Sequence, residues 1–296
     1  MTDDQGELVT TDARDRSGSN GSDSGSGSSG GRGDGVEVNL DIHLAHSARM
    51  YDFYLGGTTN FPADREAAGR ALAVFPYARS AARANRAFMR RSTRLLARSG
   101  IRQFLDIGTG IPTSPNLHEV AQQVVPDAAV VYADNDPIVL LHAQALLRGT
   151  EQGVTAYVQA DVREPDALLE AAARTLDFER PIALSMNALL HFVPDDAHRI
   201  TEGLKARLPR GSALVISHLT PDFAPDETTR LIQVYTAAGT PVAACTSEEF
   251  GRFFTGWDVL DPGVVATTRW NPSLEEDTER ISDAGASCYG AVAVRP

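Results

Sequence analysis

From residue 101 onward, apolar residues fall in short continuous runs separated by longer segments of mixed polarity. The apolar runs lie at residues 101–108, 128–136, 154–162, 181–192 and 211–219. The segments between them have apolar residues at the spacing of amphipathic helices, and they lie at residues 114–125, 137–149, 165–176, 195–208 and 224–239. Apolar strands that alternate with helices are typical of a mostly parallel sheet with helices on both faces. We therefore predict an α/β fold.

The end of the chain departs from this alternation. Residues 257–270 and 286–296 both have the composition of strands, and little helical sequence separates them. Neighbouring strands with a short connection usually pair in opposite directions. We therefore predict an antiparallel hairpin at one edge of the sheet.

The residues before 101 have a different organisation. Residues 43–98 have a helical pattern, which Gly and Pro interrupt at 55–62 and 75–78. Residues 17–35 are mostly Ser and Gly, so this segment cannot bury enough apolar surface to offset its ordering entropy. We predict three parts: a disordered acidic tail over 1–36, a helical lid over 37–100, and the α/β domain over 101–296.

Composition narrows the possible partners and compartments. The formal net charge of −12 argues against broad binding to nucleic acids, because phosphate contacts need a basic surface. The two cysteines, Cys245 and Cys288, form neither a metal-ligand spacing nor a disulfide framework, which favours the cytoplasm and no metal. No run of about 18 apolar residues is present, so we expect no membrane span.

The turn after the first predicted strand, FLDIGTGIPT at residues 104–113, carries an acid and two glycines. Gly108 and Gly110 allow a sharp turn and a close approach of the backbone to a ligand. A dinucleotide-binding fingerprint would continue to a third glycine, where Thr113 stands here. The carboxylate of Asp106 would repel a pyrophosphate and suits a ligand with a cationic end. S-adenosyl-L-methionine, which carries an ammonium and a sulfonium group, is such a ligand.

Acids also end the second and third predicted strands. Asp134 is placed to accept from the ribose hydroxyls of such a ligand, and Asp161 to accept from its adenine amino group. Because ligands bind beyond the carboxyl ends of the strands in open α/β sheets, we predict that both acids and Asp106 line one crevice. The alternative is that they are ordinary strand-end acids that accept backbone N–H bonds. Asp136 competes for the ribose contact, and we prefer Asp134 because it directly follows the apolar run.

Several phrases of the sequence resemble known motifs. FLDIGTG, VVYADND, VQADV and ALSMNALLHF resemble the motif series of Rossmann-like (class I) S-adenosylmethionine-dependent methyltransferases. More narrowly, HSARMYDFYLGGTTNFPADREAA and ANRAFMRRSTRLLARSGIRQFLDIGTGIPT resemble an actinobacterial S-adenosyl methyltransferase family, formerly a domain of unknown function. This resemblance covers about residues 39–296.

The resemblance implies a seven-stranded, mostly parallel sheet with an antiparallel last strand, and no particular methyl acceptor. It also implies S-adenosyl-L-methionine as cofactor, bound by Asp106, Gly108, Thr109, Gly110, Asp134, Asn135, Asp161 and Val162.

Two features depart from the pattern. Pro112 occupies the third glycine position of D-x-G-x-G-x-G, and it has no N–H to offer a ligand. Thr58 and Thr59 stand where we expect a charged pair, so the choice of acceptor can differ here.

The fourth predicted strand should end beside the transferred methyl group. The cofactor carries the difficult chemistry, so the protein has to bind and orient the reactants. Asn187 would line the cofactor pocket, and His191 is the candidate general base because imidazole titrates near neutral pH. The alternative, which we favour, is that His191 packs in the turn. His218, after the fifth strand, is a second candidate.

A methyltransferase sheet does not cover its own active site, so we expect a lid. The segment RMYDFYLGG offers Arg49, Tyr51 and Tyr54 as acceptor contacts and a hinge at Gly56–Gly57. The alternative is that both tyrosines are core residues. Asn85 lies on the apolar side of a later helix, so it either fixes a backbone turn or reaches the pocket.

Arginines recur every three or four residues between 79 and 98 and would form a stripe along one helix face. They are Arg79, Arg83, Arg86, Arg90, Arg94 and Arg98. A basic stripe can bind phosphates. In a chain this acidic we expect it instead to face solvent or to pair with acids of its own domain.

We predict a methyltransferase of the cytoplasm that uses S-adenosyl-L-methionine and acts on a small-molecule acceptor. Three alternatives stay open: a non-catalytic protein that senses the cofactor or its product, a nicotinamide-dependent oxidoreductase, and a nucleic-acid methylase. The arginine stripe favours the last. The negative charge and the lack of an Asn/Asp-Pro-Pro-aromatic motif at the fourth strand disfavour it. The sequence does not indicate an oligomeric state.

Overall fold

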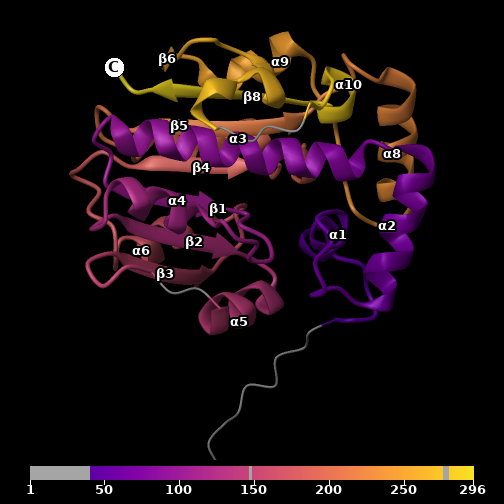
Figure 1. The fold of residues 1–296 in the computed structure, drawn as a ribbon, viewed down its shortest axis with the longest axis horizontal. Helices are drawn as coiled ribbons and strands as arrows, with labels where there is room; N and C mark the ends of the chain where they lie inside the picture. The colour runs from indigo at the N-terminus through magenta and orange to yellow at the C-terminus, as the bar shows by residue number, and fades with distance from the viewer. Residues whose placement is uncertain (1–40, 147–148, 276–279) are drawn as a thin grey trace, which may run out of the picture. The chain divides into compact units, whose positions relative to one another are not determined.

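A computed structural model describes residues 41–146, 149–275 and 280–296, which belong to one compact unit (Figure 1). The tail predicted over residues 1–36 lies outside the described residues. Within the described ranges, no helix has both the length and the apolar character needed to cross a membrane.

The unit is built on a sheet with the strand order β3-β2-β1-β4-β5-β8-β6, and β7 also pairs with β8. The parallel strands are β1 (Gln103–Ile107), β2 (Ala129–Asp134), β3 (Val154–Gln159), β4 (Ala183–Asn187) and β5 (Ala213–Leu219). β8 (Cys288–Val294) lies beside β5 and runs antiparallel to it. The predicted α/β fold with a reversed last strand is therefore confirmed.

The strand predicted over residues 257–270 is broken into two short pieces. β6 (Asp258–Val259) and β7 (Val265–Ala266) both pair antiparallel with β8, at different points along it. Pro262 lies between them and has no N–H to donate to a ladder, so the strand cannot continue through it. The described residues thus form an eight-stranded sheet in place of the seven strands expected.

A helix follows each of the parallel strands, as the apolar pattern predicts. They are α4 (Leu117–Val124), α5 (Pro137–Leu146), α6 (Pro165–Ala172), α7 (Ala197–Ala206) and α8 (Pro225–Ala237). Proline, whose missing N–H costs nothing in the first turn, begins α5, α6 and α8. The later elements are shorter and comprise α9 (Ser247–Gly251), α10 (Asp283–Ala286), and the 3₁₀ turns η1 (Leu190–Phe192), η2 (Arg252–Phe254), η3 (Thr267–Arg269) and η4 (Pro272–Leu274).

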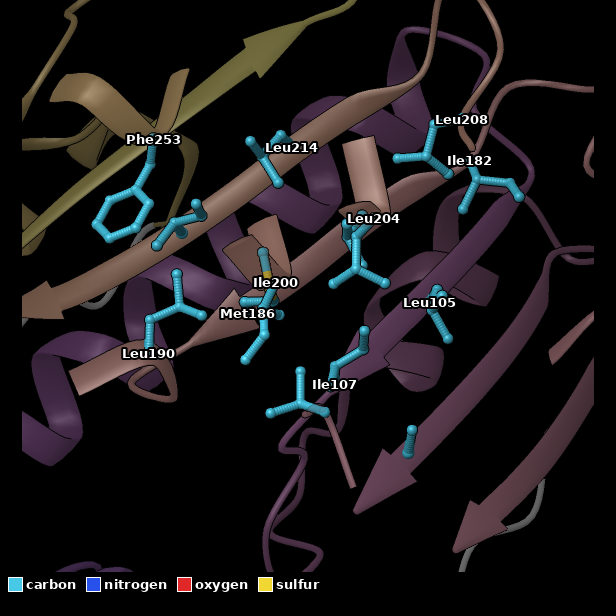
Figure 2. Close-up of a cluster of buried hydrophobic side chains, with 14 of the residues drawn as sticks. Leu105, Ile107, Ile182, Met186, Leu190, Ile200, Leu204, Leu208, Leu214 and Phe253 are labelled. Carbon is cyan, nitrogen blue, oxygen red and sulfur yellow. The ribbon is translucent and has the colours of Figure 1, made fainter. Parts of the chain in front are cut away.

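Successive side chains of β1 point to opposite faces of the sheet, and each face has its own core. Leu105 and Ile107 belong to a buried cluster with residues of α6 and α7. Figure 2 shows part of this cluster, including Leu105 and Ile107 of β1 together with Ile200 and Leu204 of α7. Phe104 belongs to a second cluster with α4 and with the long helix α3 (Ala78–Arg98). The sheet is thus covered on both faces.

The N-terminal helices occupy two different places. α3 lies along one face of the sheet and contacts α4, β4, β5 and β8. α1 (Ser47–Tyr54) and α2 (Pro62–Val74) lie with α8 at the end of the sheet to which the arrows of β1 to β5 point (Figure 1). Residues 37–100, which we expected to form one lid, therefore include a helix of the sheet layer. A lid is proposed below for α1 alone.

Two arginines of the stripe bind groups of their own domain, as we expected. Arg90 forms an ion pair with Glu275, and Arg94 donates to the carbonyl of Leu274 at 3.0 Å. Arg91, outside the predicted stripe, is only 1% exposed. It donates to the carbonyls of Trp270, at 2.8 Å, and of Thr267, at 2.6 Å. This side chain therefore fastens α3 to the segment that leads into the last strand.

We expect the substitution Arg91→Met to lower the free energy of unfolding by about 2 kcal/mol, because it leaves two buried carbonyls without their donor. Urea unfolding measures this change. Arg98→Met, at the exposed end of the same helix, serves as control and should change the free energy by less than about 0.5 kcal/mol. Equal effects of both substitutions would contradict the fastening role.

Candidate active site

The loops after β1, β2, β3 and β4 meet at the carboxyl end of the sheet and enclose a cavity of about 290 Å³. Every residue predicted to bind the cofactor lines it: Asp106, Gly108, Thr109, Gly110, Asp134, Asn135, Asp161, Val162 and Asn187. Tyr51 of α1 and Asn85 and Arg86 of α3 also line this cavity, hereafter the first cavity. The structure therefore brings together side chains from strand ends that are far apart in the sequence.

The turn after β1 requires its glycines. Gly108 and Gly110 have φ angles of +70° and +67°, in the left-handed region that other residues rarely adopt. A Cβ atom on Gly108 would lie 2.6 Å from Cδ1 of Leu189. The N–H of Gly108 donates to the carbonyl of Ala133 at 2.8 Å, so the turn is fixed against the end of β2.

Asp106 is a buried acid in the wall of the first cavity. The residue is 8% exposed, and burial raises the pKa of the Asp106 carboxyl to about 6. Hydrogen bonds with Thr109 and Ser185 and the charge of Arg86 limit this rise in pKa. A buried carboxylate costs free energy unless a cation or further donors compensate it. This acid is therefore suited to a ligand with a positive charge.

Asp134 ties the end of β2 to the glycine turn. Its Oδ2 accepts from the N–H of Gly110 at 2.9 Å, and its Oδ1 accepts from the N–H of Asp136 at 3.0 Å. Asp134 therefore accepts backbone N–H bonds, as an ordinary strand-end acid does. Each of its oxygens nevertheless keeps a further lone pair for a ligand. Burial raises the pKa of this carboxyl.

Asp136 is engaged elsewhere. Its Oδ1 accepts from the N–H of Ile138 at 2.9 Å, and its Oδ2 lies 3.2 Å from Nε of Arg49. Asp136 is not among the residues that line the first cavity, whereas Asp134 is. The predicted lid residue Arg49 is likewise buried, at 3% exposure, and holds α1 against this acid.

Asp161 is paired with a residue that the sequence analysis missed. Nε of Arg163 donates to its two oxygens at 2.9 and 3.1 Å, and these hydrogen bonds lower the pKa of the carboxyl. A hydrogen bond with the side chain of Asn135 also lowers this pKa. Arg163 lines the first cavity as well. Its position two residues after Asp161 was a signal that could have been used.

Arg86 is the second residue whose place in the site was missed, because it was grouped with the arginine stripe. It donates to the carbonyls of Thr113 and Pro115. Burial lowers the pKa of its guanidinium, because a cation removed from water loses its hydration. It therefore places a fixed positive charge beside Asp106 and the glycine turn.

The two candidate histidines, His191 and His218, lie away from the first cavity. Nδ1 of His191 accepts from the N–H of Leu219 at 3.4 Å, and burial lowers its pKa well below the usual value. His218 contacts the carbonyl of Leu219 and Sγ of Cys245, and burial lowers its pKa to about 4. Neither residue lines the first cavity. His191 packs in the turn after β4, as the interpretation that we favoured expects.

The tyrosines predicted for the lid are held by hydrogen bonds to α3 and α8. The hydroxyl of Tyr51 donates to the carbonyl of Ala82 at 3.0 Å and accepts from Nδ2 of Asn85, also at 3.0 Å. The hydroxyl of Tyr54 shares a hydrogen bond of 3.1 Å with that of Tyr235. Tyr54 does not line the first cavity. Tyr51 thus lines the first cavity, whereas Tyr54 belongs to a buried cluster with residues of α2 and α8.

Comparisons with known proteins agree with this geometry. A family model described as S-adenosyl methyltransferase matches residues 34–296. The chain belongs to the S-adenosyl methyltransferase family. The resemblance noted in the sequence is therefore confirmed, and S-adenosyl-L-methionine is the cofactor of this methyltransferase.

Two solved structures are similar to this methyltransferase over most of its length. A DUF574 family protein from Streptomyces avermitilis is 46% identical, with a TM-score of 0.83 over 87% of this chain and 100% of that chain. A protein from Thermobifida fusca assigned as a methyltransferase is 38% identical, with a TM-score of 0.79 over 86% of this chain and 97% of that chain. No curated protein matches the chain.

The first cavity fits this cofactor on two observations. Asp106 offers a buried carboxylate to a cationic ligand. Asn187 donates from Nδ2 to Oγ of Ser185 at 2.7 Å, while its Oδ1 is buried and has no hydrogen-bond partner among the described residues. A buried acceptor without a donor usually awaits one from water or a ligand. The ammonium group of the cofactor is a donor of this kind.

Proposed function

We propose that this methyltransferase transfers the methyl group of S-adenosyl-L-methionine to a small-molecule acceptor. The observation that carries the proposal is the first cavity, in which four strand ends gather a buried acid, an unpaired amide oxygen and a glycine turn. The net charge of −12 also favours a small acceptor over a nucleic acid. The two cysteines in the structure are both free, which supports our proposal of the cytoplasm as its compartment.

The amino-acid end of the cofactor would lie near the glycine turn. We assign its ammonium group to Asp106 and to Oδ1 of Asn187, because these are the buried acceptors of the cavity. Arg86 would hold its carboxylate, since a guanidinium matches the geometry of a carboxylate. The backbone of Gly108 and Thr109 would lie alongside, and position 108 has no room for a side chain.

The nucleoside end would lie along the ends of β2 and β3. Asp134 keeps lone pairs for the two ribose hydroxyls while its backbone bonds hold the carboxylate still. Asp161 and Asn135 would meet the polar edge of the adenine, and the buried Val162 its face. Arg163 orients Asp161 through its ion pair, so it is a positioning residue.

The bound cofactor supplies a methyl group that its sulfonium already activates for transfer. The protein has to bind the reactants, align them and keep water out. We propose α1 as the lid, because Tyr51 reaches the cavity from this helix while the Arg49–Asp136 contact holds the helix in place. Gly57 is required for packing as well as for a hinge, since a Cβ atom there would lie 1.9 Å from Oδ1 of Asp52.

Calorimetric titration with S-adenosyl-L-methionine, S-adenosylhomocysteine and NADH tests the proposal. We expect the first two to bind and NADH to bind at least about 100-fold more weakly, because a pyrophosphate would face the buried acid. Tighter binding of NADH would overturn the assignment. A screen of acceptor pools for methylated product then separates an enzyme from a sensor of the cofactor. Binding without turnover in every pool would favour the sensor.

A further inference from the structure

A second cavity of about 80 Å³ adjoins the first, and residues of α1 and α8 form part of its lining. Most of its walls are buried side chains, contributed by α1, α3, η1 and α8 among other segments. The two cavities share part of their lining, namely Ser47, Tyr51, Asn85, Ala188 and Phe192. A molecule in the second cavity would therefore be separated from the cofactor only by these side chains.

The lining of the second cavity, all of which the structure describes, includes no Asp, Glu, Lys or Arg. It includes the rings of Tyr51, Tyr54, Phe75, Phe192 and Tyr235. Moving an ion into such surroundings costs several kcal/mol unless an opposite charge accompanies it. Aromatic walls favour another flat ring, which can stack or meet them edge-on. The cavity therefore selects an uncharged aromatic molecule.

His191 offers this cavity a donor and no basic site. Because the N–H of Leu219 donates to Nδ1 of His191, the neutral ring carries its proton on Nε2. Burial lowers the pKa of this ring well below its usual value, so it stays neutral at physiological pH. Burial also raises the pKa of the Cys288 thiol and of the Tyr235 hydroxyl to about 12. These lining groups do not accept a proton from a bound acceptor.

The shared wall is held by a chain of hydrogen bonds. Oγ of Ser217 accepts from the N–H of Ala188 at 2.9 Å and donates to Oδ1 of Asn85. Asn85 in turn donates to the hydroxyl of Tyr51 at 3.0 Å. The strand β5, the helix α3 and the helix α1 are thereby connected at the boundary between the cavities. Asn85 and Tyr51 are fixed where an acceptor and the cofactor would meet.

We propose that the second cavity is the acceptor site and that the acceptor is a small, uncharged aromatic molecule that presents a nitrogen lone pair to the shared wall. This proposal rests on the proposed function. A hydroxyl acceptor would have to lose a proton, for which the lining has no base. A nitrogen lone pair forms the new N–CH₃ bond directly as the S–CH₃ bond breaks. The electron pair of that bond stays on sulfur, and the positive charge passes to nitrogen. The product is therefore a cation, which these uncharged surroundings favour releasing.

The test compares two substitutions on α3 by ligand-observed NMR with saturating S-adenosylhomocysteine at pH 8. Ala81 lines the second cavity, so Ala81→Leu reduces its volume. Ala87 is also partly buried but lines neither cavity, so Ala87→Leu is the matched control. The probe is 3-methylpyridine, with 3-methylphenol and benzoate as its phenol and anion counterparts. Val242→Phe, at another wall, serves if Ala81→Leu does not fold.

We expect 3-methylpyridine to bind the native protein and the Ala87→Leu variant, and Ala81→Leu to weaken this binding at least about tenfold. The affinity for S-adenosylhomocysteine should stay the same in both variants. With S-adenosyl-L-methionine, mass spectrometry should detect the N-methylpyridinium product.

Three results would overturn the inference: probe binding that Ala81→Leu leaves unchanged, benzoate binding as tight as that of 3-methylpyridine, or methylation of the phenol alone. Loss of S-adenosylhomocysteine binding in the native protein is a different outcome. It would overturn the proposed function, on which the acceptor site depends.

Discussion

Asp134→Ala should weaken S-adenosylhomocysteine binding by a few hundred-fold. The carboxylate of Asp134 is proposed to accept from two ribose hydroxyls, and hydrogen bonds to a charged group are worth about 1.5 to 2 kcal/mol each. Its existing bonds from the N–H groups of Gly110 and Asp136 hold it in one orientation, so little ordering is needed when the ligand binds. Isothermal titration calorimetry at pH 8 measures the loss.

Two further variants separate the ligand contact from damage to the glycine turn. Asp134→Asn keeps one carbonyl oxygen for a backbone N–H and should lose about ten- to thirty-fold in affinity. Asp166→Ala removes an acid whose side chain is 93% exposed, on α6, and should bind as the native protein does. An Asp134→Ala variant with native affinity would show that this acid serves only the backbone.

Asp106→Asn should change affinity and stability in opposite directions. At pH 8 the variant should bind S-adenosylhomocysteine about 30-fold more weakly, because a neutral amide replaces the carboxylate proposed to face the ammonium group. The same variant should unfold at higher urea concentration, with a gain of about 1 to 3 kcal/mol at pH 7. The gain arises because the folded variant buries a neutral amide instead of a charged carboxylate.

The expected gain in the free energy of unfolding follows from the pKa of Asp106, which is about 6 in the folded protein. An ordinary aspartate titrates near 3.9, so the folded state holds its proton more tightly than the unfolded state. The contribution of this group to stability is therefore complete below pH 4 and is lost as the pH rises through about 6. The variant should not show this loss.

The affinity of the native protein should follow the same titration. A cationic ligand favours the carboxylate, so binding should weaken about tenfold between pH 7 and pH 5 and release protons near pH 6. Calorimetry in buffers of different ionisation enthalpy detects this release. Asp166→Asn is the control for both measurements. A native affinity that is flat from pH 5 to pH 7 would remove Asp106 from the contact with the ammonium group.

The fold and the first cavity could be predicted from the sequence because both depend on local patterns. Apolar runs with period two or without polar interruption predict strands, and acids that follow them must meet at the carboxyl edge of a parallel sheet. Asp106, Asp134 and Asp161 line one cavity for this reason. The glycine turn could also be predicted, because two glycines directly after a strand indicate a sharp turn. In the structure both have positive φ angles.

The second cavity could not be predicted, because residues far apart in the sequence form it. Tyr54 and Tyr235 share a hydrogen bond across 181 positions. The candidate role of His191 as a base beside the methyl group required the chain to continue straight after β4, and the packing in the turn that we favoured did not. Instead Ala188 has φ of +53°, and the 3₁₀ turn η1 follows at once. No periodicity in the sequence indicates such a change of direction.

The broken strand at the edge of the sheet has a consequence for how the folded protein behaves at high concentration. A long edge strand presents consecutive unpaired N–H and C=O groups, to which a strand of another molecule can add. Here β6 and β7 are two residues each, and Pro262 separates them. They cover β8, whose residues are almost all buried, and they leave too short a ladder for further pairing. The interruption therefore protects this edge of the sheet against edge-to-edge aggregation.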